Sequence, residues 1–143
     1  MTSRRTGVRN YIALVVKKDG DHEEAMGYYG QRIVLLIQSL GLNSCWVGFT
    51  FKNIKEAYRA EPDDKLRMVI ACGYGETSGV ARKVRPVEKF YKDARTGNAP
   101  FPEWFTKGME AALLAPTAMN RQKFFFTLLD GNKVTAKANF EWA

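Results

Sequence analysis

The sequence has few of the residues that build metal and disulfide sites. Its 143 residues include two cysteines, Cys45 and Cys72, and one histidine, His22. The cysteines lack the paired spacing of zinc ligands, and a single histidine cannot complete such a set. Both cysteines lie in apolar stretches, which is typical of buried free thiols. We therefore expect no bound metal.

Long apolar runs are also missing. No stretch reaches the about 20 residues that cross a bilayer, and no apolar signal segment follows the basic start at residues 1–5. These absences predict a soluble, cytoplasmic protein with no membrane partner. The net charge of +7 permits binding of nucleic acid or of small anions. Because the basic residues are dispersed and do not alternate with aromatic ones, we expect no nucleic-acid partner.

The hydrophobic pattern predicts an α+β protein with a mixed sheet, in a single domain over residues 1–143. Two apolar runs predict buried strands at 10–16 and 66–73. Apolar positions three and four residues apart predict helices at 22–40 and 103–114. Less regular patterns predict short helices at 52–60 and 87–92, an exposed linker at 94–102, and a hairpin of 124–129 with 133–138 around Asp130-Gly131-Asn132.

The predicted helix at 22–40 has two unusual features. Val34 and Leu35 widen its apolar stripe, so we expect burial over much of its surface. Gly27 and Gly30 lie inside it, where each glycine costs about 1 kcal/mol relative to alanine. Such a cost predicts close packing or a flat ligand at these positions. Gly41 is expected to end the helix in a left-handed conformation.

Polar side chains gather where the second helix ends. Residues 115–123, APTAMNRQK, place Thr117, Asn120 and Gln122 between a helix-ending proline and a strand. Junctions of this kind carry binding sites more often than element interiors do. The alternative is helix termination followed by an ordinary polar turn.

Two further stretches have the same two interpretations. Residues 41–48, GLNSCWVG, form a turn in which Gly48 would let the backbone approach a flat ring, or a buried core turn. Arg82, Lys83 and Arg85 could bind phosphate, since arginine does so through two hydrogen bonds, or could form a solvated basic loop. Composition alone does not decide between these alternatives.

Together these stretches resemble the nitroreductase family. Residues 27–51, GYYGQRIVLLIQSLGLNSCWVGFTF, and the later strand ending in GYGE resemble the second half of that fold. Residues 109–126, MEAALLAPTAMNRQKFFF, resemble its first half, in which a helix leads into Ala-Pro-Ser-x-x-Asn-x-Gln-Pro and a strand. The segment Arg82-Lys83-Val84-Arg85 stands where the family has an Arg-Arg-Ser-x-Arg start. The resemblance covers residues 10–138.

The order of the motifs is that of a special group within the family. The second-half motif comes first, as in nitroreductases that fuse two nitroreductase-like halves in one chain. The resemblance implies that this chain is a partial copy, incomplete at both ends. Two residues depart from the pattern: Thr117 replaces serine and keeps the hydroxyl, and Lys123 replaces proline.

The resemblance implies a flavin mononucleotide (FMN) cofactor and a site for it. Arg82, Lys83 and Arg85 would bind its phosphate, and Thr117, Asn120 and Gln122 the polar edge of its ring. Backbone groups of Trp46, Val47 and Gly48 would face its reactive nitrogen. Hydride would pass from NAD(P)H through the flavin to a small nitroaromatic or quinone-like acceptor, and no catalytic side chain is named. A homodimer is one assembly that would complete the site. The alternatives are a non-catalytic flavin-binding or interaction module and an inactive fragment.

Overall fold

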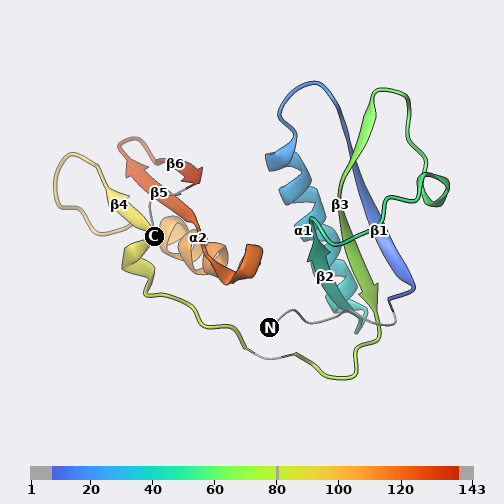
Figure 1. Ribbon diagram of the computed structural model, residues 1–143. Coiled ribbons are helices and arrows are strands. Elements are labelled where there is room, and N and C mark those ends of the chain that lie inside the picture. The colour runs from blue at the N-terminus through green and yellow to red at the C-terminus, as the bar shows by residue number, and fades with distance from the viewer. Residues whose placement is uncertain (1–7, 80, 139–143) are drawn as a thin grey trace. The chain divides into compact units, whose positions relative to one another are not determined.

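The computed structural model describes residues 8–79 and 81–138 (Figure 1). The basic start at residues 1–5 lies outside these ranges. The chain divides into two compact units, residues 1–79 and 80–143. The described part of each unit contains one α-helix and one three-stranded sheet. The α+β class is confirmed, but the strands form two sheets where the sequence predicted one. None of the helices in the described ranges is long and apolar enough to cross a membrane.

The first unit is an antiparallel sheet with one helix against it (Figure 1). Its strands lie in the order β1-β3-β2, so the strand latest in sequence is central. The predicted helix at 52–60 is reduced to one 3-10 turn, because its few apolar residues cannot form a face to bury. The elements are β1 (Asn10–Lys17), α1 (Glu23–Ser39), β2 (Asn43–Val47), η1 (Lys55–Ala57) and β3 (Asp64–Gly73).

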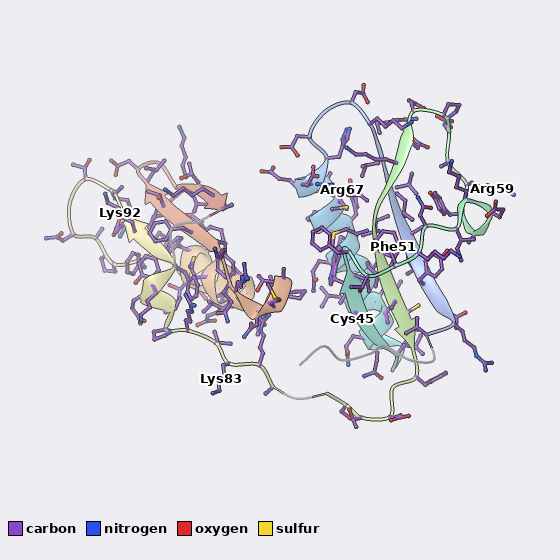
Figure 2. All side chains as sticks on the ribbon, viewed as in Figure 1. Cys45, Phe51, Arg59, Arg67, Lys83 and Lys92 are labelled. Atoms are coloured by element: carbon purple, nitrogen blue, oxygen red, sulfur yellow. The ribbon has the colours of Figure 1, made fainter. Side chains whose placement is uncertain are left out.

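The central strand β3 supplies most of the core of this unit. Ile70 is fully buried, and its partner in register on β2 is Trp46. Trp46 packs on Gly30 of α1, so α1 covers the Trp46 and Ile70 face of the sheet. The opposite face holds a cluster of Val47, Val69 and Ala71 with Phe51, which Figure 2 labels on the loop after β2. β1 was predicted to be buried on both faces, but it is an edge strand and only half-buried.

Helix α1 ends as the sequence predicts. Gly41 has φ +75°, its N–H donates to the carbonyl of Gln38 at 3.0 Å, and the N–H of Leu42 donates to that of Ile37 at 3.1 Å. These two bonds form a Schellman motif. The predicted burial of the helix is wrong: its large apolar side chains at 28, 29, 35, 36 and 40 are exposed. A single small sheet covers only one side of the helix, which leaves Gly30 and Ile37 as its buried residues.

The second unit orders its strands β4-β5-β6, with β4 parallel and β6 antiparallel to the central β5. Helix α2 and the β5–β6 hairpin have their predicted bounds. The predicted helix at 87–92 is instead a 3-10 turn followed by the three-residue strand β4, which the sequence did not indicate. The elements are η2 (Val87–Lys89), β4 (Tyr91–Asp93), α2 (Glu103–Leu114), η3 (Ala118–Asn120), β5 (Phe124–Leu129) and β6 (Lys133–Ala138).

The core of the second unit is aromatic. Phe90, Phe105, Met109 and Leu128 are buried together, and the ring of Phe124 stacks on that of Phe90 with centroids 4.9 Å apart. These residues come from β5, α2 and the end of η2. This core therefore packs α2 against β5. The polar turn 115–123 connects these two elements.

The predicted linker at 94–102 lies inside the second unit. The Arg95 guanidinium bonds the Asp93 carboxylate and the carbonyl oxygens of Ala99 and Pro100. The boundary between the units lies at residues 79 and 80. A single nitroreductase-like domain over residues 1–143 stays a prediction.

Candidate cofactor site

The polar turn after α2 has an unusual backbone. Pro116 follows Ala115, which is extended (φ −63°, ψ 129°), and the helix ends there. Met119, Asn120 and Gln122 then adopt left-handed conformations with φ of 52°, 52° and 51°. Each such residue that is not glycine costs about 1 kcal/mol or more, and such residues cluster at binding sites.

One buried side chain joins this turn to the basic segment. Gln122 is 4% exposed and is the only buried polar side chain in the described residues. Its Nε2 donates to the carbonyl of Lys83 at 2.9 Å and to Oδ1 of Asn120 at 3.0 Å, and its Oε1 accepts from the N–H of Arg85 at 3.3 Å. The side-chain amide therefore holds residues 83–85 against the turn.

Two neighbouring side chains complete this hydrogen-bond network. Nδ2 of Asn120 donates to the carbonyl of Lys83 at 2.9 Å, and the Thr117 hydroxyl accepts from the N–H of Gln122 at 3.0 Å. Among the bonds of the described residues, the Asn120 amide keeps one N–H and one acceptor position, and the Thr117 hydroxyl keeps its hydrogen. Gln122 uses both of its amide hydrogens. The turn can therefore present Asn120 and Thr117 to a ligand, but not the donors of Gln122.

The basic segment contains two kinds of cation. Arg82 is half-buried, and its guanidinium donates to the carbonyl of Ala115 at 2.6 Å and to that of Leu113, where the last carbonyls of α2 carry partial negative charge. Lys83, labelled in Figure 2, and Arg85 are exposed and have no side-chain partner within the described ranges. Arg121 on the turn is a third exposed cation of this kind, which the sequence pattern did not indicate.

Comparison with known proteins agrees with these motifs. Residues 2–141 match the model of a family described as "Putative TM nitroreductase". The chain belongs to this nitroreductase family. Its fold is similar to the crystal structure of a putative nitroreductase from Thermotoga maritima MSB8, with a TM-score of 0.61 and 24% identity. That match covers 93% of this chain and 59% of the other, so this chain spans less than two thirds of that relative. A search of curated proteins found no match.

The remaining predicted site residues lie in the first unit, on and after β2. Trp46 packs on Gly30, where an added Cβ would overlap its Cη2 and lie 3.0 Å from Cζ2 and Cζ3. Its buried Nε1 has no partner among the described residues. β2 is an edge strand, so alternate backbone N–H groups of residues 43–47 face away from β3. The side chains of Trp46 and Val47 belong to the core. Only backbone groups of Val47 and Gly48 could therefore contact a ligand.

Two other groups of reactive side chains have structural explanations. The Lys17 ammonium lies among three carboxylates, 2.6 Å from Glu61, 3.1 Å from Asp63 and 2.9 Å from Asp64. The ammonium thus stands where a metal ion could otherwise bind these acids. The Glu61 N–H and Lys17 both lower the pKa of the Asp64 carboxyl. Of the two thiols predicted to be buried, Cys45 on the edge strand β2 is exposed (Figure 2) and Cys72 on β3 is half-buried.

Proposed function

We propose that this chain is an FMN-dependent oxidoreductase of the nitroreductase type, which transfers hydride from NAD(P)H to a small nitroaromatic or quinone-like acceptor. The observation that carries the proposal is the bridge between residues 83–85 and the turn 117–122. Three side-chain hydrogen bonds of Gln122 and Asn120 to the backbone of residues 83 and 85 bring cations and ring-binding groups to one place. Family membership supports a flavin as the ligand.

The cations fit the phosphate end of FMN. A phosphate dianion needs donors that carry positive charge and are not already paired. Lys83, Arg85 and Arg121 meet that requirement among the described residues, because no acid bonds them. Arg82 does not meet it, since its guanidinium bonds the end of α2. In this proposal Lys83 and Arg85 bind the phosphate, and Arg82 fastens the segment that carries them.

The polar turn fits the pyrimidine edge of a flavin ring. That edge displays donors and acceptors side by side, and Asn120 offers one of each beyond its own bonds. Thr117 adds a hydroxyl hydrogen. A role for backbone groups of Trp46, Val47 and Gly48 near the reactive nitrogen stays a prediction.

The chemistry divides simply between cofactor and protein. A bound flavin supplies the electron transfer. The residues of this chain bind and orient it: cations hold the phosphate and the turn holds the ring edge. No side chain has to give or take a proton, and the turn 115–123 contains no acidic side chain.

Flavin titration tests the proposal. The purified protein is mixed with FMN and the visible spectrum is followed, and NADH or NADPH is then added without oxygen. We expect a spectral shift on binding, bleaching by one nicotinamide, and return of colour with a nitroaromatic or quinone acceptor. No uptake at micromolar FMN would refute the proposal. Uptake without bleaching would favour the non-catalytic flavin-binding module.

A second copy of this chain is proposed as its partner. Helix α1 exposes Tyr28, Tyr29, Leu35, Leu36 and Leu40, and exposed apolar surface of that kind favours association. Light scattering with and without FMN gives the mass in solution. A monomer under both conditions at high protein concentration would contradict the dimer without affecting the flavin proposal.

A further inference from the structure

The side chain of Gln122 bonds other residues of the protein and has no hydrogen left for a ligand. Its side chain is buried, and all its bonds go to groups of the protein: the carbonyl of Lys83, the N–H of Arg85 and the side chain of Asn120. A buried amide whose hydrogens are all bonded has none to offer a ligand. The sequence pattern places Gln122 beside Asn120 as a second ring contact, and the hydrogen bonds point to a different role.

The bonds of Gln122 restrict the backbone of Lys83 and Arg85, the two cations of the basic segment that are unpaired among the described residues. Lys83 and Arg85 lie in a segment that has no secondary structure from residue 81 to Pro86. Such a segment would have to be ordered each time an anion binds, at a cost in affinity. A bond to the carbonyl of residue 83 and another to the N–H of residue 85 fix the backbone on both sides of Val84 before any ligand arrives.

We propose that Gln122 is a positioning residue for phosphate recognition: it holds the backbone of Lys83 and Arg85 on the turn that carries Arg121, so that three cations are set in advance for one phosphate group. This inference rests on the proposed function and assigns Gln122 to neither the ring nor the phosphate itself. Its consequence is selectivity: loss of Gln122 should weaken binding of the phosphorylated flavin much more than binding of the ring, because Asn120 loses one bond but keeps its own bond to the Lys83 carbonyl.

The pair FMN and riboflavin tests this selectivity, because the two ligands share the ring and differ in the phosphate. Gln122→Met keeps the length of the side chain and removes every hydrogen bond. We expect FMN affinity to fall about tenfold, the loss of about one charge-assisted bond, with riboflavin affinity within about twofold. The control Gln38→Met makes the same change on the exposed face of α1 and should alter neither. Equal losses for FMN and riboflavin would overturn the inference.

A second measurement separates this inference from the proposed function. Backbone hydrogen exchange is compared in wild type and Gln122→Met, without ligand. We expect faster exchange of the Arg85 N–H, which bonds Gln122 Oε1, and unchanged exchange in the core strand β5. Unchanged exchange at Arg85, or equally faster exchange in β5, would overturn the positioning role. Failure of the wild type to bind FMN would refute the proposed function, and hydrogen exchange would still decide whether Gln122 holds the segment.

A more conservative variant keeps the test possible if Gln122→Met folds poorly. Gln122→Asn keeps a neutral amide but is one methylene shorter, so it cannot bond the Lys83 carbonyl and the Arg85 N–H at the same distances. The ratio of FMN to riboflavin affinity should fall here too. A ratio equal to that of the wild type would overturn the inference.

Discussion

Replacement of Gly30 by alanine tests the packing of α1 on its sheet. An added methyl would overlap Cη2 of Trp46 and lie 3.0 Å from Cζ2 and Cζ3, so three adjoining atoms of one rigid ring must move. Overpacking of this kind costs about 1–3 kcal/mol. Alanine in place of glycine gains about 1 kcal/mol in a helix. We therefore expect Gly30→Ala to lower the free energy of unfolding by up to about 2 kcal/mol.

The matched control lies in the same helix. A Cβ at Gly27 would have no atom of another element within 4 Å, so Gly27→Ala should raise the free energy of unfolding by about 0.5–1 kcal/mol. Urea unfolding followed by circular dichroism measures both. A third protein combines Gly30→Ala with Trp46→Leu, in which the smaller side chain should remove the clash and make Gly30→Ala neutral or stabilising. Equal stabilisation by alanine at 27 and 30 in the wild type would refute the packing argument.

Three further predictions concern the second unit. Asn120→Ala should weaken binding of riboflavin by about 1–3 kcal/mol, measured by flavin fluorescence, and binding of FMN by at least as much, because Asn120 also bonds the Lys83 carbonyl; unchanged riboflavin affinity would make Asn120 a turn residue only. Arg82→Gln should lower the free energy of unfolding, measured in urea, by about 1–2 kcal/mol, because the last carbonyls of α2 lose their donor. Lys83→Gln should change that free energy by less than about 0.5 kcal/mol. Equal effects of the two variants would contradict the assignment of Arg82. Bonds from Arg95 lower the pKa of the Asp93 carboxyl, so its stabilisation is present above the ordinary aspartate pKa and is lost as pH falls through the folded pKa. The melting temperature of Asp93→Asn should therefore fall less than that of the wild type between about pH 5 and pH 2, and parallel curves would disprove the linkage.

The sequence predicted best the elements whose ends have local causes. Helix α2 lies between Pro102 and Pro116, and the hairpin turns at Gly131 and Asn132, which have φ of 71° and 56°. Backbone preferences of this kind act within a few residues and can be seen in the sequence. The strand β4 has no such cause. Its three residues pair with residues 126–128 of β5, and that pairing depends on how α2 brings the two segments together.

The candidate site was predictable in position and not in detail. The motif around Asn120 identified the turn, and the comparison confirmed the family. The sequence could not show that Arg82 bonds the end of α2 or that Gln122 is enclosed, because both facts depend on side chains more than 30 residues apart. It likewise could not show the exposure of α1, since a wide apolar stripe is compatible with any number of covering elements.

The outer strand of the second sheet bears on how copies of this protein behave at high concentration. All residues of β6 are exposed, and one of its edges carries backbone groups that pair with none of the strands in the described residues. Unpaired edges of this kind can add a strand from a neighbouring molecule and start aggregation. Lys133 and Lys137 stand on that strand, and their like charges repel the same strand of another copy. Solubility of the protein should therefore decrease as salt screens these charges, and neutral replacements at both positions should favour fibrous or amorphous aggregates.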